Sequence, residues 1–398
     1  MFRRFLILLA LAVAFSPICV HAQQTNDLKK GDPDVIDGFP SDPDGAIRAT
    51  REMIAAGNMD GAIKALAVYV FAHPGEWGPR RFLGDLYFRT GQIEKAQKMY
   101  EEILARQPLD KETHNRLGSV LAAENKVDEA ITQFNAALPG TESVPDLVAL
   151  HLRKGDVAAY KTQMERAAAN FPNDSDLQAE LGQVYNAINQ PYAASVSFKR
   201  ALDSDPKNLS ALNGLGLSYL AMGQYGEAIS TFDQCLKDER AAYLCQDNLG
   251  ATYLEEKHFD EAQVALDKAF KLAPERAETF VNYGYLSDAR GNWQDAVNQY
   301  AHAISVWPYL REAYIDIAID YEEHHLNALA QQALVKGLAS VHDDGRLHYL
   351  LGKAYEAQGD SKDAVAQFEL AAQGSDPDAA RIARELVAQL GGTVSKPN

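Results

Sequence analysis

Cysteines and cationic residues are scarce in this chain. Of its 398 residues, 3 are cysteine and 38 are Lys or Arg, against 55 Asp and Glu, so the formal net charge is −17. No close Cys-x-x-Cys pair is present, which argues against a redox-active dithiol. A strongly acidic surface repels phosphate groups, so we expect neither nucleic acid nor an anionic lipid surface as a partner.

Long apolar runs are also rare. One such run covers residues 5–15, follows Arg3 and Arg4, and is too short to span a bilayer. Pro17 breaks it, and a small residue stands at the end of residues 1–22, as at a cleavage site. We therefore expect 1–22 to be a cleaved signal peptide, with export to the periplasm or secretion. We expect no transmembrane segment in the mature chain.

Catalytic motifs are missing too. The chain has no zinc-protease helix motif, no phosphate-binding glycine loop and no nucleophile elbow. The nearest candidate is a set of acids and histidines expected around a turn between helices, where polar residues occur in any case. We predict no catalytic residue, no metal and no cofactor, and a metal-dependent enzyme or regulator is kept as an alternative. The set comprises Glu322, Glu323, His324, His325, His342, Asp343, Asp344 and His348.

A repeating pattern fills most of the chain. An alanine recurs at steps of 34 residues, with a glycine twelve residues before it, a large apolar residue four after it and often a proline twelve after it. A period of this length indicates an array of small helical units that stack on one another. The alanines are Ala62, Ala96, Ala130, Ala194, Ala228, Ala262, Ala296, Ala330 and Ala364, and Tyr160 takes this place in one unit.

This pattern resembles the tetratricopeptide repeat. The resemblance covers residues 43–378 and implies an all-α, right-handed α-solenoid of ten 34-residue units, each a pair of antiparallel helices, without insertion or deletion. We expect the glycine of the first helix to face the alanine of the second. A capping helix at 379–390 would cover the last unit. Residues 23–42 and 391–398 would form a flexible leader and tail.

The resemblance also implies a groove lined by the first helix of each unit. At its sixth position Asn248, Asn282 and Asp316 follow one another at 34-residue spacing, and Asn213 stands one position earlier. Side-chain amides can donate to and accept from the backbone of an extended peptide. We predict that this polar ladder binds extended or helical segments of partner proteins.

An apolar stripe and an acidic rim are expected beside the ladder. Residues 243–344 hold 17 Asp and Glu against 7 Lys and Arg, which would attract a basic partner or simply keep the surface solvated. The stripe could equally pack against the neighbouring unit. Its members are Val281, Tyr285, Ile315 and Ile319, and the rim consists of Asp247, Glu278, Asp288, Glu312 and Glu322.

Two cysteines remain after cleavage of the leader. Cys235 and Cys245 stand five residues on either side of Arg240, which fills a position usually taken by proline. In a hairpin of antiparallel helices, residues equidistant from the turn face each other, so a disulfide is predicted. Two buried thiols are the alternative.

Two parts of the pattern differ from the rest. Arg81, Arg89 and Arg116 form a basic cluster on expected groove positions, which could hold an acidic segment. The unit that carries Tyr160 is irregular, and we expect either a hinge or a degenerate repeat, with proteolysis first between residues 139 and 145.

Together these features predict an exported protein-interaction scaffold, of the kind found in envelope assembly or secretion complexes. The alternative is a structural spacer that acts through its convex face or its ends.

Overall fold

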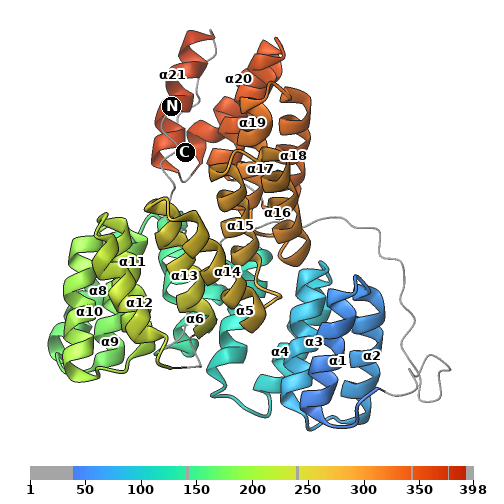
Figure 1. Cartoon of the computed structure of the whole chain (residues 1–398), viewed down its shortest axis with the longest axis vertical. Helices are drawn as coiled ribbons and strands as arrows, with labels where there is room; N and C mark the ends of the chain where they lie inside the picture. The colour runs from blue at the N-terminus through green and yellow to red at the C-terminus, as the bar shows by residue number, and fades with distance from the viewer. Residues whose placement is uncertain (1–38, 140–142, 239–241, 342–343, 375, 391–398) are drawn as a thin grey trace. The chain divides into compact units, whose positions relative to one another are not determined.

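α-Helices are the regular structure of this protein. The computed structural model describes residues 39–139, 143–238, 242–341, 344–374 and 376–390, and within these ranges it contains helices and no strand (Figure 1). Consecutive helices form antiparallel pairs, and one further helix follows, which confirms the all-α prediction. The pairs are α1 (Pro43–Ala55) with α2 (Met59–Ala72), α3 (Trp77–Arg89) with α4 (Ile93–Leu104), α5 (Lys111–Ala123) with α6 (Val127–Ala137), α7 (Ser143–Lys154) with α8 (Val157–Asn170), α9 (Ser175–Ala187) with α10 (Pro191–Ser204), α11 (Leu209–Ala221) with α12 (Tyr225–Cys235), α13 (Ala242–Glu255) with α14 (Phe259–Leu272), α15 (Ala277–Ala289) with α16 (Trp293–Val306), α17 (Arg311–Glu323) with α18 (Asn327–Ser340) and α19 (Gly345–Ala357) with α20 (Ser361–Gln373), and the last helix is α21 (Pro377–Gln389).

The helices belong to two compact units that meet in sequence between Ser143 and Val144. Helices α1 to α6 form the N-terminal unit, and the helices from α8 onward lie in the C-terminal unit. Within each unit every pair packs against the next along the chain. Because each pair contacts only its neighbours, the core of each unit is a series of adjoining apolar clusters rather than one centre.

The turns between paired helices reveal one irregular step. Each turn contains one residue with positive φ, and these residues follow at steps of 34 except from Asn125 to Gly155, where the step is 30. The array therefore lacks four residues between these turns, and the expectation of no deletion is wrong. The shift falls where the two compact units meet in sequence. Most of these turn residues are glycine, which adopts positive φ without strain, and the others are Asn125, Asn189, Lys257 and His325.

Glycines on the first helices make room for a large side chain of the paired helix. A Cβ built on Gly284 would lie 2.2 Å from Cε1 of Tyr300, which is far inside van der Waals contact. The glycine thus makes room first for the bulky residue four positions after the repeat alanine, and at Gly250 the backbone oxygen of that alanine, Ala262, also lies 3.5 Å from the built Cβ. The same pairing recurs as Gly84 with Tyr100, Gly118 with Phe134, Gly182 with Phe198, Gly216 with Phe232, Gly250 with Leu266 and Gly352 with Phe368.

The irregular pair α7 and α8 packs differently. Val148 and Tyr160 take the places of the glycine and the alanine, and both are buried. The ring of Tyr160 stacks on His151 with centroids 4.4 Å apart, so a ring pair replaces the close approach of glycine. Residues 140–142, at the centre of the predicted cleavage region, lie outside the described residues.

A disulfide joins α12 to α13. Cys235 and Cys245 are bonded, their Cα atoms are 6.2 Å apart, and both residues are fully buried. The bond connects two successive helix pairs directly.

The ends of the described region are built into the fold. Phe39 packs against the first apolar cluster, and Oδ1 of Asp42 accepts a hydrogen bond from the Gly45 amide at the start of α1. Residues 39–42 of the expected flexible leader therefore belong to the fold, and its earlier residues lie outside the described ones. At the other end α21 covers apolar residues of α20, and none of the described helices is long and apolar enough to cross a membrane. The predicted signal peptide and tail lie outside the described residues.

Candidate partner-binding wall of the first helices

The first helices of successive pairs lie side by side in the C-terminal unit. We call the surface formed by α9, α11, α13, α15, α17 and α19 the first-helix wall. Polar side chains connect these helices: Gln183 donates to Ser210 over 2.6 Å, and the Lys353 ammonium lies 3.6 Å from Glu322. The wall is therefore held together by polar contacts as well as by its apolar core.

The predicted polar ladder lies on this wall, but its side chains already make hydrogen bonds within the protein. Nδ2 of Asn248 donates to Oδ1 of Asn213 over 2.6 Å, and both side chains are partly exposed. Asn282 is only 5% exposed and hydrogen-bonds Asp247. The accessible amides are thus Asn213 and Asn248, while Asn282 joins two helices from within.

Two residues of the apolar stripe are buried and two remain partly accessible. Val281 is fully buried and Ile315 is 5% exposed, and both belong to the core cluster of α15 to α19. Tyr285 and Ile319 pack against the same cluster and remain partly accessible. The expectation that Val281 and Ile315 face a ligand is wrong, because the neighbouring helix pair covers them.

One member of the acidic rim is also buried. Asp247 is 2% exposed, and its Oδ2 lies 3.8 Å from Nε of Arg276, which in turn lies 3.6 Å from Glu278. Burial raises the pKa of Asp247, and the Arg276 guanidinium acts in the opposite direction. Asp247 therefore forms an inter-helix ion pair and is not available at the rim.

A group of carboxylates gathers where α15 meets α17. Oδ2 of Asp316 accepts a hydrogen bond from the Tyr285 hydroxyl over 2.8 Å. Burial, opposed by the Tyr285 hydrogen bond and reinforced by the charges of Glu312, Asp320 and Asp288, raises the pKa of Asp316 to about 7. The crowding of carboxyls on adjacent helices thus favours the protonated form of Asp316.

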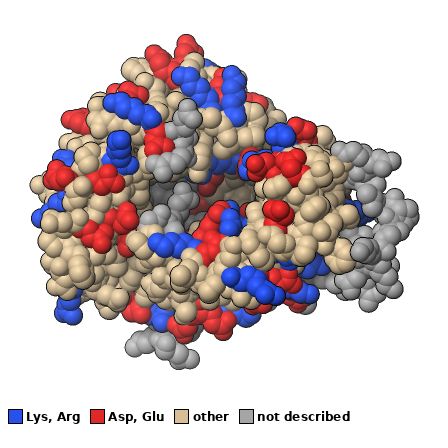
Figure 2. Space-filling view, turned by 90° about the horizontal axis from the view of Figure 1, so that it is seen from below, with Lys and Arg blue, Asp and Glu red and all other residues tan. Residues whose placement is uncertain are grey.

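The wall is acidic over three neighbouring helices. Helices α13, α15 and α17 together contain nine Asp and Glu and one Lys or Arg. The partly exposed members on α15 and α17 include the remaining predicted rim residues Glu278, Asp288, Glu312 and Glu322. Figure 2 shows acidic and basic side chains interspersed over the face of the molecule that it draws.

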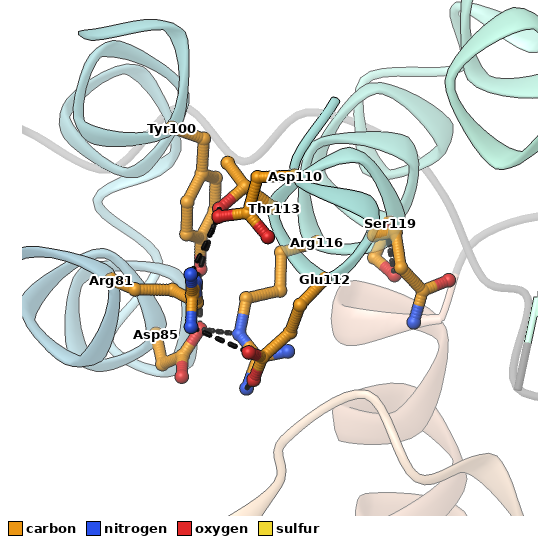
Figure 3. A network of polar contacts seen from close by, with 9 residues as sticks. Arg81, Asp85, Tyr100, Asp110, Glu112, Thr113, Arg116 and Ser119 are labelled. Atoms are coloured by element: carbon orange, nitrogen blue, oxygen red, sulfur yellow. Dashed lines mark hydrogen bonds and ion pairs between the residues drawn. The ribbon is translucent and has the colours of Figure 1, made fainter. Parts of the chain in front are cut away.

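The basic cluster of the N-terminal unit is paired within the fold (Figure 3). The Arg81 guanidinium donates to Asp110 and to Glu112, each over 2.5 Å. Nε of Arg116 donates to Oδ1 of Asp85 over 2.7 Å. Two of the three predicted arginines are thus neutralised by neighbouring carboxylates, which argues against the predicted grip on an acidic segment.

The candidate metal-binding residues are dispersed among separate partners. The ring of His324 stacks on Trp293 with centroids 4.2 Å apart, and Nδ1 of His348 lies 2.7 Å from Oε1 of Gln367. In the described part of the chain no three acids, histidines or cysteines are placed so that together they could hold a metal ion. His342 and Asp343 lie outside the described residues.

Several solved structures resemble this one. A tetratricopeptide repeat protein from Parabacteroides merdae is 20% identical, with 64% of this chain and 99% of that chain covered and a TM-score of 0.46. Yeast Tom70 is 13% identical, with 87% of this chain and 96% of that chain covered and a TM-score of 0.46. The structure of the APC/C hetero-tetramer Cut9–Hcn1 is 13% identical, with 88% of this chain and 90% of that chain covered and a TM-score of 0.45. No protein of curated function matches the sequence.

Family models described as tetratricopeptide repeat match four parts of the chain. The matched residues are 83–145, 197–230, 245–276 and 315–380. They cover helices of both compact units. The matched segments and the recurring helix pairs show that this chain belongs to the tetratricopeptide repeat family, whose members act as protein–protein interaction scaffolds.

Proposed function

We propose that this scaffold binds a basic segment of a partner protein on its first-helix wall, between α11 and α17. The observation that carries the proposal is the charge of the wall, where seven of the nine acids on α13, α15 and α17 are at least partly exposed and these helices contain one base. A segment rich in Lys and Arg would meet complementary charge there, which favours both encounter and register.

Three kinds of contact are available to such a segment. The Asn213 and Asn248 amides use one group each in their mutual hydrogen bond, so the Asn213 amino group and the Asn248 carbonyl can meet a peptide backbone. The partly exposed Tyr285 and Ile319 offer apolar contact. Glu278 and the other rim carboxylates would pair with cations. The proposal involves no catalytic step.

Export remains part of the proposal. The charged start and short apolar run at residues 1–22 favour a cleaved signal peptide, and an exported scaffold of this kind suits an envelope assembly or secretion complex. N-terminal sequencing of the protein from its host tests this directly. A mature chain that still begins at Met1 would contradict export through a cleaved signal.

The binding proposal is tested with a display library of random 12-residue segments selected on the mature chain. We expect the selected segments to be enriched in Lys and Arg. A variant with Glu278→Gln, Asp288→Asn and Glu312→Gln should bind them at least tenfold more weakly, since it removes three wall charges without removing side-chain volume.

A matched variant distinguishes the wall from the overall charge of the protein. Glu227→Gln, Asp233→Asn and Glu261→Gln remove the same charge from exposed positions on α12 and α14. This variant should retain full affinity. If both variants bind equally well, the wall is not the working surface and the structural spacer becomes the better account.

A further inference from the structure

A pocket with an aromatic floor opens among α14, α15 and α16. Its cavity volume is about 420 Å³, and its lining includes Phe270 of α14 and Phe280 and Tyr283 of α15. We call it the aromatic pocket. Its lining residues differ from those assigned to the first-helix wall, so any ligand here is separate from the one proposed above.

Phe270 packs edge to face against both Phe280 and Tyr283, and these last two rings are tilted with respect to each other. The centroids of Phe270 and Phe280 are 5.6 Å apart, and those of Phe280 and Tyr283 are 6.5 Å apart. Phe270 remains 37% exposed although it is a large apolar side chain. Phe280 is 8% exposed, so the accessible ring surface of the pocket, which carries negative potential on the ring faces, belongs to Phe270 and Tyr283.

Two carboxylates stand at the edge of the pocket. Oδ1 of Asp267 accepts hydrogen bonds from Tyr283 over 2.8 Å and from Gln263 over 2.9 Å, while Oδ2 of Asp295 accepts one from Ser287 over 2.6 Å. These contacts fix the orientation of each carboxylate and use one of its two oxygens. Both side chains are exposed, so the other oxygen of each can meet a ligand.

The one cation in the lining is held by its own neighbours. The Arg290 guanidinium lies 3.1 Å from Oδ1 of Asp260 and donates to the Gln263 amide oxygen and to the Phe259 carbonyl. Its charge is offset by Asp260, so Asp267 and Asp295 leave the site negative. The pKa of Tyr283 is raised by burial and by its hydrogen bond to Asp267, which keeps this ring neutral.

We propose that the aromatic pocket binds a lysine or arginine side chain of a partner protein. The ring faces would contact the alkyl stem and the cation, and Asp267 and Asp295 would pair with the head group. A pocket that combines ring faces with carboxylates selects a cation on an apolar stem over a neutral side chain of the same length.

The test uses the mature chain labelled with 3-fluorotyrosine and observed by ¹⁹F NMR. The Tyr283 signal is assigned by its loss in Tyr283→Phe. Nα-acetyl-lysine methylamide and its arginine counterpart should shift this signal in a saturable way. The norleucine counterpart, which has a similar stem and no charge, should bind at least threefold more weakly.

Variants then separate this site from the first-helix wall. Asp267→Asn with Asp295→Asn should weaken the lysine probe at least threefold, while Glu227→Gln with Asp233→Asn should leave it unchanged. The wall variant Glu278→Gln, Asp288→Asn and Glu312→Gln should also leave it unchanged, so failure of one site is not failure of the other. Equal shifts with the lysine and norleucine probes, or an unchanged affinity in the double aspartate variant, would overturn the proposal.

Discussion

The hydroxyl of Tyr285 on α15 donates a hydrogen bond to Oδ2 of Asp316 on α17 over 2.8 Å. This contact holds a partly buried carboxyl against the next first helix, within reach of the charges of Glu312, Asp320 and Asp288. Ionisation of Asp316 in the folded protein therefore costs free energy that the unfolded chain does not incur. The wall that carries the binding proposal is also a source of pH dependence.

We predict that folding stability falls as pH rises from about 4 to about 7. The pKa of Asp316 is about 7 in the folded protein, against 3.8 for the unperturbed group. Between these values the folded state binds more protons than the unfolded state, so the free energy of unfolding decreases with rising pH. The effect should total about 2 kcal/mol, less than the full linkage value because the side chain is partly exposed.

Urea unfolding at several pH values checks this prediction. Asp316→Asn should make the free energy of unfolding nearly independent of pH over this range and should raise it at pH 8. Asp260→Asn, at an exposed position, should leave the pH dependence of the free energy of unfolding unchanged. An unaltered pH dependence in Asp316→Asn would assign the effect to other groups.

Substitution of a close-packed glycine should destabilise the fold. A Cβ on Gly284 would lie 2.2 Å from the Tyr300 ring, so Gly284→Ala should lower the free energy of unfolding by about 1–3 kcal/mol. Gly226→Ala is the matched control, because nothing lies within 4 Å of a Cβ at that helical position. The control should be neutral or slightly stabilising, since alanine favours helix. Equal effects of the two changes in chemical denaturation would refute the packing argument.

Two ion pairs occupy the same two positions of the repeat, but the acid and the base have exchanged places between them. Arg81 pairs with Asp110 in the N-terminal unit, and Asp247 pairs with Arg276 in the C-terminal unit. Arg81→Asp should lower stability by about 1–3 kcal/mol, because it leaves Asp110 beside another acid. Adding Asp110→Arg should restore at least half of the loss, since the later pair shows that this arrangement fits. Thermal unfolding measures both, and a double variant no better than the single one would contradict the equivalence.

Removal of the disulfide should cost stability without changing the fold. The bond spans ten residues, and loop-closure entropy for that length gives about 3 kcal/mol. The double variant Cys235→Ala with Cys245→Ala should unfold at a lower urea midpoint than the oxidised parent. Its midpoint should equal that of the parent protein whose disulfide has been reduced. An oxidised parent that unfolds at the same midpoint as the double variant would show that the bond contributes nothing.

The period of the sequence was sufficient to predict the helix pairs, but not which groove positions are open. Val281 and Tyr285 both stand on the predicted groove side of α15, yet the next helix pair buries the first and only partly covers the second. Such differences depend on side chains from another unit, and a position number within the repeat does not contain them. The ladder shows the same limit, because Asn282 is buried against Asp247.

Two further features were missed by the sequence analysis for different reasons. The four-residue shift is contained in the repeat positions themselves, because Tyr160 follows Ala130 by 30 residues, and the left-handed turn residues Asn125 and Gly155 show the same step. The aromatic pocket brings Phe270 and Phe280 together from different helices. Each ring alone looks like an ordinary apolar residue of its own helix.

The disulfide between Cys235 and Cys245 also has a mechanical meaning. When a helix pair is pulled open, its roughly 34 residues can lengthen the chain by about 120 Å, at about 3.5 Å for each residue. The ten-residue interval closed by the bond cannot extend. The oxidised chain should therefore lengthen under tension by about 35 Å less than the reduced chain. Under load the oxidised protein would pass force from α12 to α13 through a covalent bond, and reduction would release that length.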